Sequence, residues 1–201
     1  MKPYCLEVCA DSVESALEAQ KGGADRIELC GNLVIGGVSP GRALFRLVKK
    51  YTDLEVRVLL RPRYGDYCYN DYEFEQLKEE VELYKELGAD GVVIGMLRPD
   101  GALDVERMRE LVSLAGHMDV ALHRAFDICK DPFEALEEAV SLGMKTILTG
   151  GQEVMAWEGR ETLAKLQKKS AGRIQILAGG GIGKDVIRKL LPVTEITSYH
   201  M

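Results

Sequence analysis

Two short segments of the 201-residue chain each combine a carboxylate with a thiol. Glu7 and Cys9 lie in YCLEVCA near the start, and Glu28 and Cys30 lie in RIELCGN. Polar and apolar residues alternate in both segments, so a strand would place each carboxylate and its thiol on one face. Carboxylates in a pocket act as general acids or bases, and paired thiols suit a soft ion such as Cu(I). The segments therefore indicate acid–base chemistry, a metal site, or both.

Further polar residues and glycines follow the other segments that are predicted to be strands. They occur in LLRPRYGDYCY, ALHRAFDIC, ILTGGQ and LAGGGIG. Loops of random composition would scatter lysine and glutamate instead, so this pattern predicts a polar pocket. Besides the four residues above, its predicted members are Arg61, Arg63, Asp66, His123, Arg124, Asp127, Thr149, Gly150, Gly179, Gly180 and Gly181.

An enzyme would use the charged members of this set for proton transfer. Glu7 or Glu28 would be the base, His123 the acid–base partner, and Arg61 part of an anion clamp. The alternative interpretation is structural. Arg61 would then neutralise two buried carboxylates that would otherwise repel each other, and His123 would be a hydrogen-bonded core residue.

The segment AGGGIGKDVIRKLL (178–191) places three glycines between a predicted strand and a predicted helix. In many barrels such a loop binds phosphate through backbone N–H groups and the N-terminus of a helix. Gly179, Gly180 and Gly181 are therefore a candidate anion site, to which Thr149 and Gly150 of the preceding loop would add donors. The alternative is ordinary turn chemistry, which also uses glycine.

The chain has five cysteines and no C-x-x-C pair. Most free cysteines are buried packing residues. If residues 4–9 form a strand, Cys5 and Cys9 lie about 13 Å apart, too far to share one ion. Cys9 and Cys30 would end neighbouring strands, which lie about 4.8 Å apart, so a two-thiolate Cu(I) site is geometrically possible there.

The elements that position these residues alternate along the whole chain. In three segments, at 20–32, 85–97 and 140–152, a helix ends at a glycine and a strand follows. We expect Asp11 and Glu14 to form a capping box, and Asp131 to cap a helix that begins at Pro132. The predicted strands are 4–9, 25–30, 55–61, 91–95, 119–123, 145–149, 173–178 and 194–198. The predicted helices are 12–21, 41–50, 72–87, 104–115, 132–142, 158–169 and 184–191.

Eight strands that alternate with helices predict an α/β fold, a (β/α)8 TIM-type barrel, as one domain over residues 1–201. Functional residues of such a barrel gather at the carboxyl ends of its strands. The chain ends just after the last predicted strand, so we expect the final helix to be absent or truncated. The apolar surface left there favours a homo-oligomer.

The bulk composition excludes several classes of protein. The net charge is −6, and no densely basic stretch suggests nucleic-acid binding. The chain has no apolar run of the length that spans a membrane and no signal-peptide pattern. We therefore expect a cytoplasmic protein whose partner is a small anion or a copper ion.

Six strings together resemble the CutC family of copper homeostasis proteins: LEVCADSVESALEAQKGGADRIELC, GGVSP, RPRYGDYCY, HRAFDICKDP, ILTGGQ and AGGGI. The resemblance runs over nearly the whole chain. It implies a (β/α)8-type barrel, a cytoplasmic location and a role in copper handling. It also implies that Cys9 and Cys30 correspond to cysteines proposed as Cu(I) ligands.

Three functional hypotheses follow. The first is a copper-binding protein that uses Cys9 and Cys30. The second is a barrel enzyme, a lyase, isomerase or hydrolase, that acts on a small phosphorylated or carboxylated molecule. The third is a binding scaffold without catalysis, which a pocket filled by side chains would favour.

Overall fold

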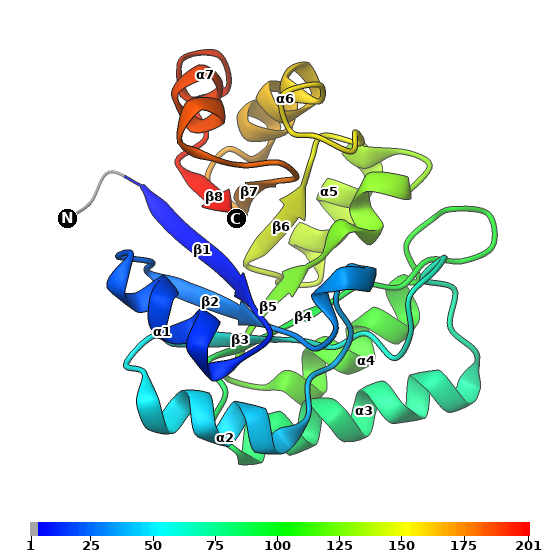
Figure 1. The fold of residues 1–201 in the computed structure, drawn as a ribbon. Helices are drawn as coiled ribbons and strands as arrows, with labels where there is room; N and C mark the ends of the chain where they lie inside the picture. The colour runs from blue at the N-terminus through cyan, green and yellow to red at the C-terminus, as the bar shows by residue number, and fades with distance from the viewer. Residues whose placement is uncertain (1–3) are drawn as a thin grey trace.

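Eight parallel strands close into a barrel in the computed structural model, which describes residues 4–201. Each strand pairs with its neighbours in sequence, and β8 pairs with β1 (Figure 1). This order confirms the predicted (β/α)8 barrel. The strands are β1 (Cys5–Ala10), β2 (Arg26–Leu29), β3 (Glu55–Leu59), β4 (Gly91–Ile94), β5 (Asp119–Leu122), β6 (Thr146–Thr149), β7 (Gln175–Gly179) and β8 (Ser198–His200).

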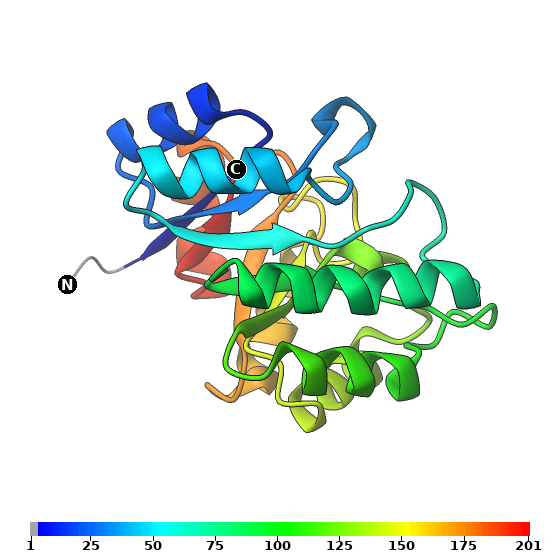
Figure 2. The same ribbon diagram turned by 90° about the horizontal axis from the view of Figure 1, so that it is seen from below.

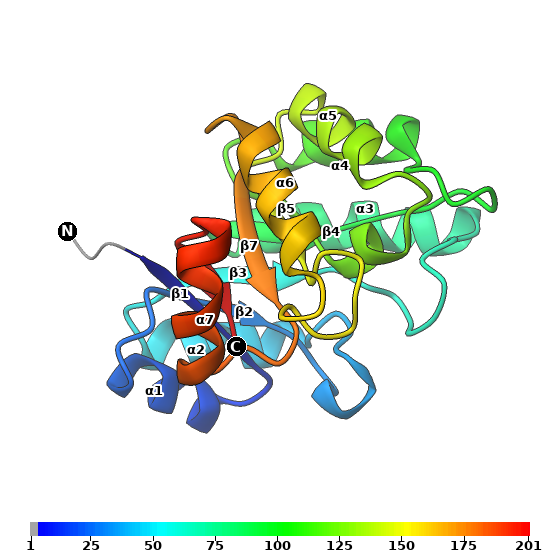
Figure 3. The same ribbon diagram turned by 90° about the horizontal axis from the view of Figure 1, so that it is seen from above.

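Helices surround the strands, as the two views turned by 90° show (Figures 2 and 3). Two 3-10 helices, η1 (Leu33–Ile35) and η2 (Arg124–Ile128), follow β2 and β5. The helices are α1 (Val13–Lys21), α2 (Arg42–Tyr51), α3 (Asp71–Glu86), α4 (Val105–Ala115), α5 (Pro132–Ser141), α6 (Arg160–Ser170) and α7 (Lys184–Thr194). No helix within residues 4–201 is long and apolar enough to cross a membrane.

The predicted bounds are wrong by more than two residues only at the end of the chain. We expected α7 to end before Pro192 and the last strand to cover 194–198. The helix instead includes Pro192 and runs to Thr194, and β8 begins at Ser198. Pro192 lies in the last turn of α7, and the hydroxyl of Thr194 donates to the carbonyl of Leu190 at 2.8 Å.

Of the two predicted helix caps, one is correct. Asp131 accepts hydrogen bonds from the N–H groups of residues 133 and 134 and precedes Pro132, as expected. The predicted capping box of Asp11 and Glu14 is wrong by one residue. Ser12 and Ser15 form it instead, because the extended backbone of Ser12 directs its hydroxyl to the Ser15 N–H.

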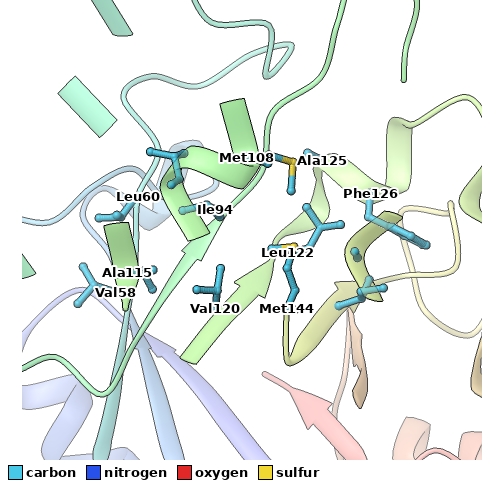
Figure 4. Close-up of a cluster of buried hydrophobic side chains, with 14 of the residues drawn as sticks. Val58, Leu60, Ile94, Met108, Ala115, Val120, Leu122, Ala125, Phe126 and Met144 are labelled. Atoms are coloured by element: carbon cyan, nitrogen blue, oxygen red, sulfur yellow. The ribbon is translucent and has the colours of Figure 1, made fainter. Parts of the chain in front are cut away.

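The apolar side chains form two layers on either side of the strands. Ile27 and Leu29 point outward into the large core between strands and helices, as alternation predicted. Cys30 points inward, where it packs with Leu59, Val93 and Ala121 inside the barrel. Figure 4 shows part of the outer layer, with labelled residues from β3, β4, β5, α4 and adjoining segments: Val58, Leu60, Ile94, Met108, Ala115, Val120, Leu122, Ala125, Phe126 and Met144.

Candidate functional site

A cavity of about 390 Å³ lies at the carboxyl ends of the strands. We call it the mouth cavity. Side chains do not fill this cavity. A filled pocket would have favoured the hypothesis of a binding scaffold without catalysis. Its lining residues are Cys9, Glu28, Cys30, Leu33, Ile35, Gly36, Leu59, Arg61, Tyr67, His123, Arg124, Asp127, Ile128, Leu148 and His200.

Glu7 lies beneath this cavity, 2 % exposed, between two cationic groups. Its Oε2 accepts from Arg26 Nε at 2.5 Å, and its Oε1 lies 2.8 Å from His200 Nδ1. Burial opposes the charge, but the hydrogen bonds and charges of His200 and Arg26 lower the pKa of Glu7 to about 2. Glu7 is therefore an ionised, fully paired carboxylate, which argues against its predicted role as a base.

The interpretation in which Arg61 neutralises both glutamates is wrong. Its Nη1 donates to the carbonyl oxygens of Gly36 and Gly37, at 3.1 and 3.0 Å. The register explains the difference, since β1 and β2 pair Glu7 with Arg26 rather than with Glu28. The arginine on the neighbouring strand therefore reaches Glu7 first.

His200 is the residue of the site that sequence reasoning missed. It ends β8, opposite Glu7 across the β1–β8 pair, and faces the cavity. Burial favours the neutral ring, but hydrogen bonds to Cys9 and Glu7 and the charges of Glu28 and Glu7 raise the pKa of His200 well above its ordinary value. The alternation in SYH, with an apolar-facing Tyr199 between two inward residues, is the signal that would have placed it.

Glu28 differs from Glu7 although both are buried. Its Oε2 has no hydrogen-bond partner within residues 4–201. Burial raises the pKa of Glu28 to about 7; the charge of His200 opposes this shift, and the charge of Glu7 adds a smaller contribution in the raising direction. Near neutral pH this carboxyl can therefore either accept or donate a proton, as a general base or acid must.

His123 is held as a neutral ring. Its Nδ1 accepts from the Ala125 N–H at 3.1 Å, so the ring proton resides on Nε2. That Nε2 is buried and has no partner within the described chain. Burial and the charge of Arg61 lower the pKa of His123 to about 3. The predicted acid–base role gives way to that of a neutral hydrogen-bond donor.

Arg61 and His123 both contact the ring of Tyr67. Tyr67 lies 4.8 Å from the guanidinium carbon of Arg61 and 4.8 Å, between ring centroids, from His123. Tyr67 adopts a φ of 62°, which non-glycine residues rarely do. Arg61 Nε, like His123 Nε2, is buried and has no hydrogen-bond partner among residues 4–201. The mouth cavity thus contains two unpaired donors beside the unpaired acceptor of Glu28.

Asp127 uses the donors that were predicted for an anion. Its carboxylate accepts from Thr149 Oγ1 at 2.5 Å and from the N–H groups of Gly150 and Gln152, and it pairs with Arg124 Nε at 2.6 Å. A carboxylate of the chain itself therefore occupies the place proposed for a substrate anion at this loop. Arg124 and Asp127 line the cavity, but they also bind each other.

The other predicted anion-binding residues lie away from the cavity lining. Gly180 packs against the loop after β6, since its carbonyl accepts from the Ala156 N–H at 2.9 Å, and neither Gly179 nor Gly181 lines the cavity within residues 4–201. Arg63 and Asp66 pair with each other at 3.1 Å on the surface. Gly180 and Gly181 have φ values of 104° and 64°, a conformation that suits glycine and agrees with the alternative of ordinary turn chemistry.

The two cysteines predicted as metal ligands both line the cavity. We expected Cys9 and Cys30 to lie level with each other at the ends of β1 and β2. The register instead places Cys9 opposite Glu28, so Cys30 lies two residues further along the chain. Cys30 is fully buried, and its thiol donates to the Ala10 carbonyl at 3.7 Å. Burial and the charge of Glu28 raise the pKa of the Cys30 thiol far above its ordinary value, which disfavours the thiolate that Cu(I) binds.

Glu7, Glu28 and His200 form a second cluster of metal-ligand type, with one atom of each within 4.8 Å of the others. Oxygen and imidazole ligands suit harder ions better than Cu(I). Glu7 is already paired with Arg26, and the environment of His200 favours the protonated ring. The negative charge of Glu7 is therefore already compensated by Arg26 and His200, and the cluster fits a metal ion poorly.

Comparisons with known proteins agree on one family. A model of the CutC family matches residues 4–201. A CutC family protein from Treponema denticola is 42% identical over 200 residues, covering 100% of this chain and 81% of its own. A copper homeostasis protein cutC homolog from Homo sapiens is 41% identical over 197 residues, covering 98% and 72%. A crystal structure of a CutC protein from Streptococcus agalactiae superposes with a TM-score of 0.93 at 27% identity, covering 98% and 97%.

Proposed function

The chain belongs to the CutC family, and from this premise we propose that its mouth cavity is an acid–base active site for a small anionic molecule. The family name connects such chains with copper homeostasis, but the best-supported chemistry of this cavity is proton transfer. A lyase or isomerase that removes a proton beside a carboxylate or phosphate is the reaction class that fits.

One observation carries the proposal: in the part of the chain that the structure describes, three buried atoms of one cavity lack hydrogen-bond partners, namely Glu28 Oε2, Arg61 Nε and His123 Nε2. A buried polar atom without a partner costs about 1–3 kcal/mol. A bound molecule with an anionic group and a removable proton would satisfy all three. Arg61 and His123 would donate to the anion, and Glu28 would take the proton.

The different environments of the three groups support these roles. With a pKa of about 7, Glu28 exchanges a proton at the pH of a cell. With a pKa of about 3, His123 stays neutral and donates without titrating. Arg61 contributes a guanidinium group, whose geometry suits an anionic partner. Groups whose environments move their pKa values apart are typical of acid–base sites.

Deuterium exchange tests this proposal without knowledge of the complete reaction. A panel of small carboxylates and phosphate esters is incubated with the protein in D2O, and loss of C–H proton signals is followed by NMR. We expect exchange in at least one compound, lost in Glu28→Gln and retained in Glu79→Gln, an exposed control on α3. A compound that raises the Tm of the wild type but exchanges no proton would contradict the acid–base role.

Copper binding is the second candidate, because Cys9 and Cys30 line the same cavity. Two thiolates would hold Cu(I), and the metal itself would have to displace the proton of the buried Cys30. The measurement is a Cu(I) titration against a competing chelator. We expect stoichiometric uptake to be lost in Cys9→Ser/Cys30→Ser and retained in Cys5→Ser/Cys68→Ser. Equal uptake by all three proteins would remove Cys9 and Cys30 as ligands.

The cytoplasm is the location that we propose, since the five cysteines are free thiols, as in a reducing compartment. We also propose a homo-oligomer, because Leu191, Val193 and Met201 expose between 42% and 51% of their surface near the end of the chain. Light scattering measures the molar mass of the purified protein in solution. The mass of a monomer at high protein concentration would contradict the proposed homo-oligomer.

A further inference from the structure

Apolar side chains line one part of the mouth cavity. Leu59 of β3 and Leu148 of β6 are buried, while Ile35 of η1 and Ile128 of η2 remain 47% and 56% exposed at the rim. Leu33 also lines the cavity and packs against the inner cluster that contains Leu59. We call these five residues the aliphatic wall. Exposed apolar surface that continues into a cavity is typical of a ligand-binding groove.

The segment 31–38, which contains η1, is held in place at the edge of the cavity. Its two end residues each donate an N–H to the carbonyl of the other, at 2.8 and 2.9 Å, so the segment closes on itself. Arg61 Nη1 donates to the carbonyl oxygens of Gly36 and Gly37 at 3.1 and 3.0 Å. A fixed backbone therefore keeps Ile35 in its exposed position, and the arginine that fixes it also lines the cavity.

Several charged groups of the cavity already bind each other. Arg124 Nε donates to Asp127 Oδ2 at 2.6 Å, and His200 Nδ1 lies 2.8 Å from Glu7 Oε1. Three buried atoms of the cavity lining have no partner within residues 4–201, and they belong to side chains that are 4–7% exposed: Glu28, Arg61 and His123. A ligand therefore meets unpaired hydrogen-bonding atoms among buried side chains and aliphatic surface toward the rim.

We propose that the ligand of the mouth cavity is an amphipathic anion, a carboxylate or phosphate that carries a hydrocarbon group. This inference rests on the anion binding proposed above and names the class of molecule at the same site. The anionic group accepts hydrogen bonds from Arg61 Nε and His123 Nε2, and the hydrocarbon group covers the aliphatic wall. The volume of about 390 Å³ lies at the lower end of the range for small-molecule sites, so the ligand is compact.

Burial of methylene groups and burial of hydroxyl groups have opposite effects on binding at such a wall. Each methylene that leaves water for an apolar surface raises the affinity about fourfold. A hydroxyl that faces Leu33, Ile35 or Ile128 loses its hydrogen bonds to water and gains no partner from these side chains. The aliphatic wall therefore selects against sugar phosphates and sugar acids, and the length of the hydrocarbon chain is the quantity to vary.

Calorimetric titration of the protein with two homologous series tests the proposal. One series is acetate, butyrate, hexanoate and octanoate, and the other consists of the corresponding alkyl phosphates. We expect Kd to fall about fourfold per added methylene in at least one series until the cavity is filled. The series with the lower Kd identifies the anionic group. Gluconate has the carbon number of hexanoate and a hydroxyl on each carbon beyond the carboxylate, and it should bind at least about tenfold more weakly than hexanoate.

Substitutions in the aliphatic wall should weaken the dependence of Kd on chain length. Ile35→Asn and Ile128→Asn should each reduce the gain in affinity per methylene to about twofold or less. Leu47→Asn is the matched control, because Leu47 is 44% exposed and belongs to α2 rather than to the cavity lining, and it should keep the wild-type gain. All three side chains are about half exposed, so the variants should stay folded, and their melting temperatures check this.

Three results would overturn the proposal: no affinity that rises with chain length in either series, tighter binding of gluconate than of hexanoate, or the wild-type gain per methylene in both isoleucine variants. If those variants keep the wild-type gain and lower the molar mass in light scattering, the rim is a contact between subunits instead. A bound alkyl compound that exchanges no proton in D2O contradicts only the acid–base role of Glu28, so the two proposals fail separately.

Discussion

Glu7 on β1 and Glu28 on β2 are both buried within the same barrel, yet their carboxyl groups titrate on opposite sides of the ordinary value. The pKa of Glu7 is lowered to about 2, because hydrogen bonds and charges from His200 and Arg26 outweigh its burial. The pKa of Glu28 is raised to about 7, because burial is not offset in the same way. One carboxyl is a fixed charge of the fold, and the other is a titratable group of the cavity.

Glu28 should make the stability of the protein depend on pH. Its folded-state pKa lies above the unfolded value, so the folded state binds more protons between about pH 4.5 and pH 7, and stability falls as the pH rises through this window. Glu28→Gln should remove this loss. We compare the unfolding free energy of Glu28→Gln with that of the wild type at each pH. The variant minus wild-type difference should increase by roughly 3 kcal/mol between pH 4.5 and pH 8.

Urea unfolding at several pH values measures this difference, with Glu79→Gln as the exposed control. If the difference in unfolding free energy between the wild type and Glu28→Gln stays constant from pH 4.5 to pH 8, the pKa of Glu28 is not raised in the folded protein.

Arg26→Met should destabilise the protein strongly, because it leaves the ionised Glu7 buried with His200 as its remaining charged partner. Breaking one side of a buried ion pair costs about 3–5 kcal/mol. The double variant Arg26→Met/Glu7→Gln should recover part of this loss, since the unpaired charge is gone. Denaturant unfolding of the four proteins in a double-mutant cycle yields the coupling energy, and additive single effects would refute a direct interaction.

Asp127→Asn should loosen the loop after β6 without disturbing the barrel. The amide cannot match a carboxylate that accepts from Thr149, Gly150 and Gln152 and pairs with Arg124. We expect a loss of about 1.5–3 kcal/mol, in the range of hydrogen bonds to charged groups. Hydrogen exchange should become faster at residues 150–152 and stay unchanged in β3. Uniform faster exchange would indicate a global effect instead.

Gly159→Ala tests the close packing of the same loop. Gly159 has a φ of −82°, which alanine adopts freely, but an added Cβ would lie 1.9 Å from the Gly150 carbonyl oxygen. Because backbone must move, we expect a loss of about 1–3 kcal/mol or more. Gly41→Ala is the matched control, since Gly41 also caps a helix and its added Cβ meets nothing within 4 Å. Equal melting temperatures for the two variants would contradict the packing.

The sequence by itself determined the architecture and the orientation of most strand residues. Helix–glycine–strand repeats predicted the barrel, and the period of two in a strand predicted that Ile27 and Leu29 face outward while Glu28 and Cys30 face inward. These are local properties, set by backbone geometry and by which face of a strand can be apolar. The family resemblance, confirmed by the comparisons, rests on the same linear pattern.

Only the tertiary structure decided which inward residues become partners. Alternation along a strand predicts which face a side chain lies on, but strand register and barrel closure determine which residues lie next to it. Register and closure place Glu7 beside Arg26 and His200 rather than beside Arg61. The same applies to Asp127, whose carboxylate uses the loop donors that looked available to a substrate. The pKa of each group then follows from its partners and burial, so the contrast between Glu7 and Glu28 exists only in the folded barrel.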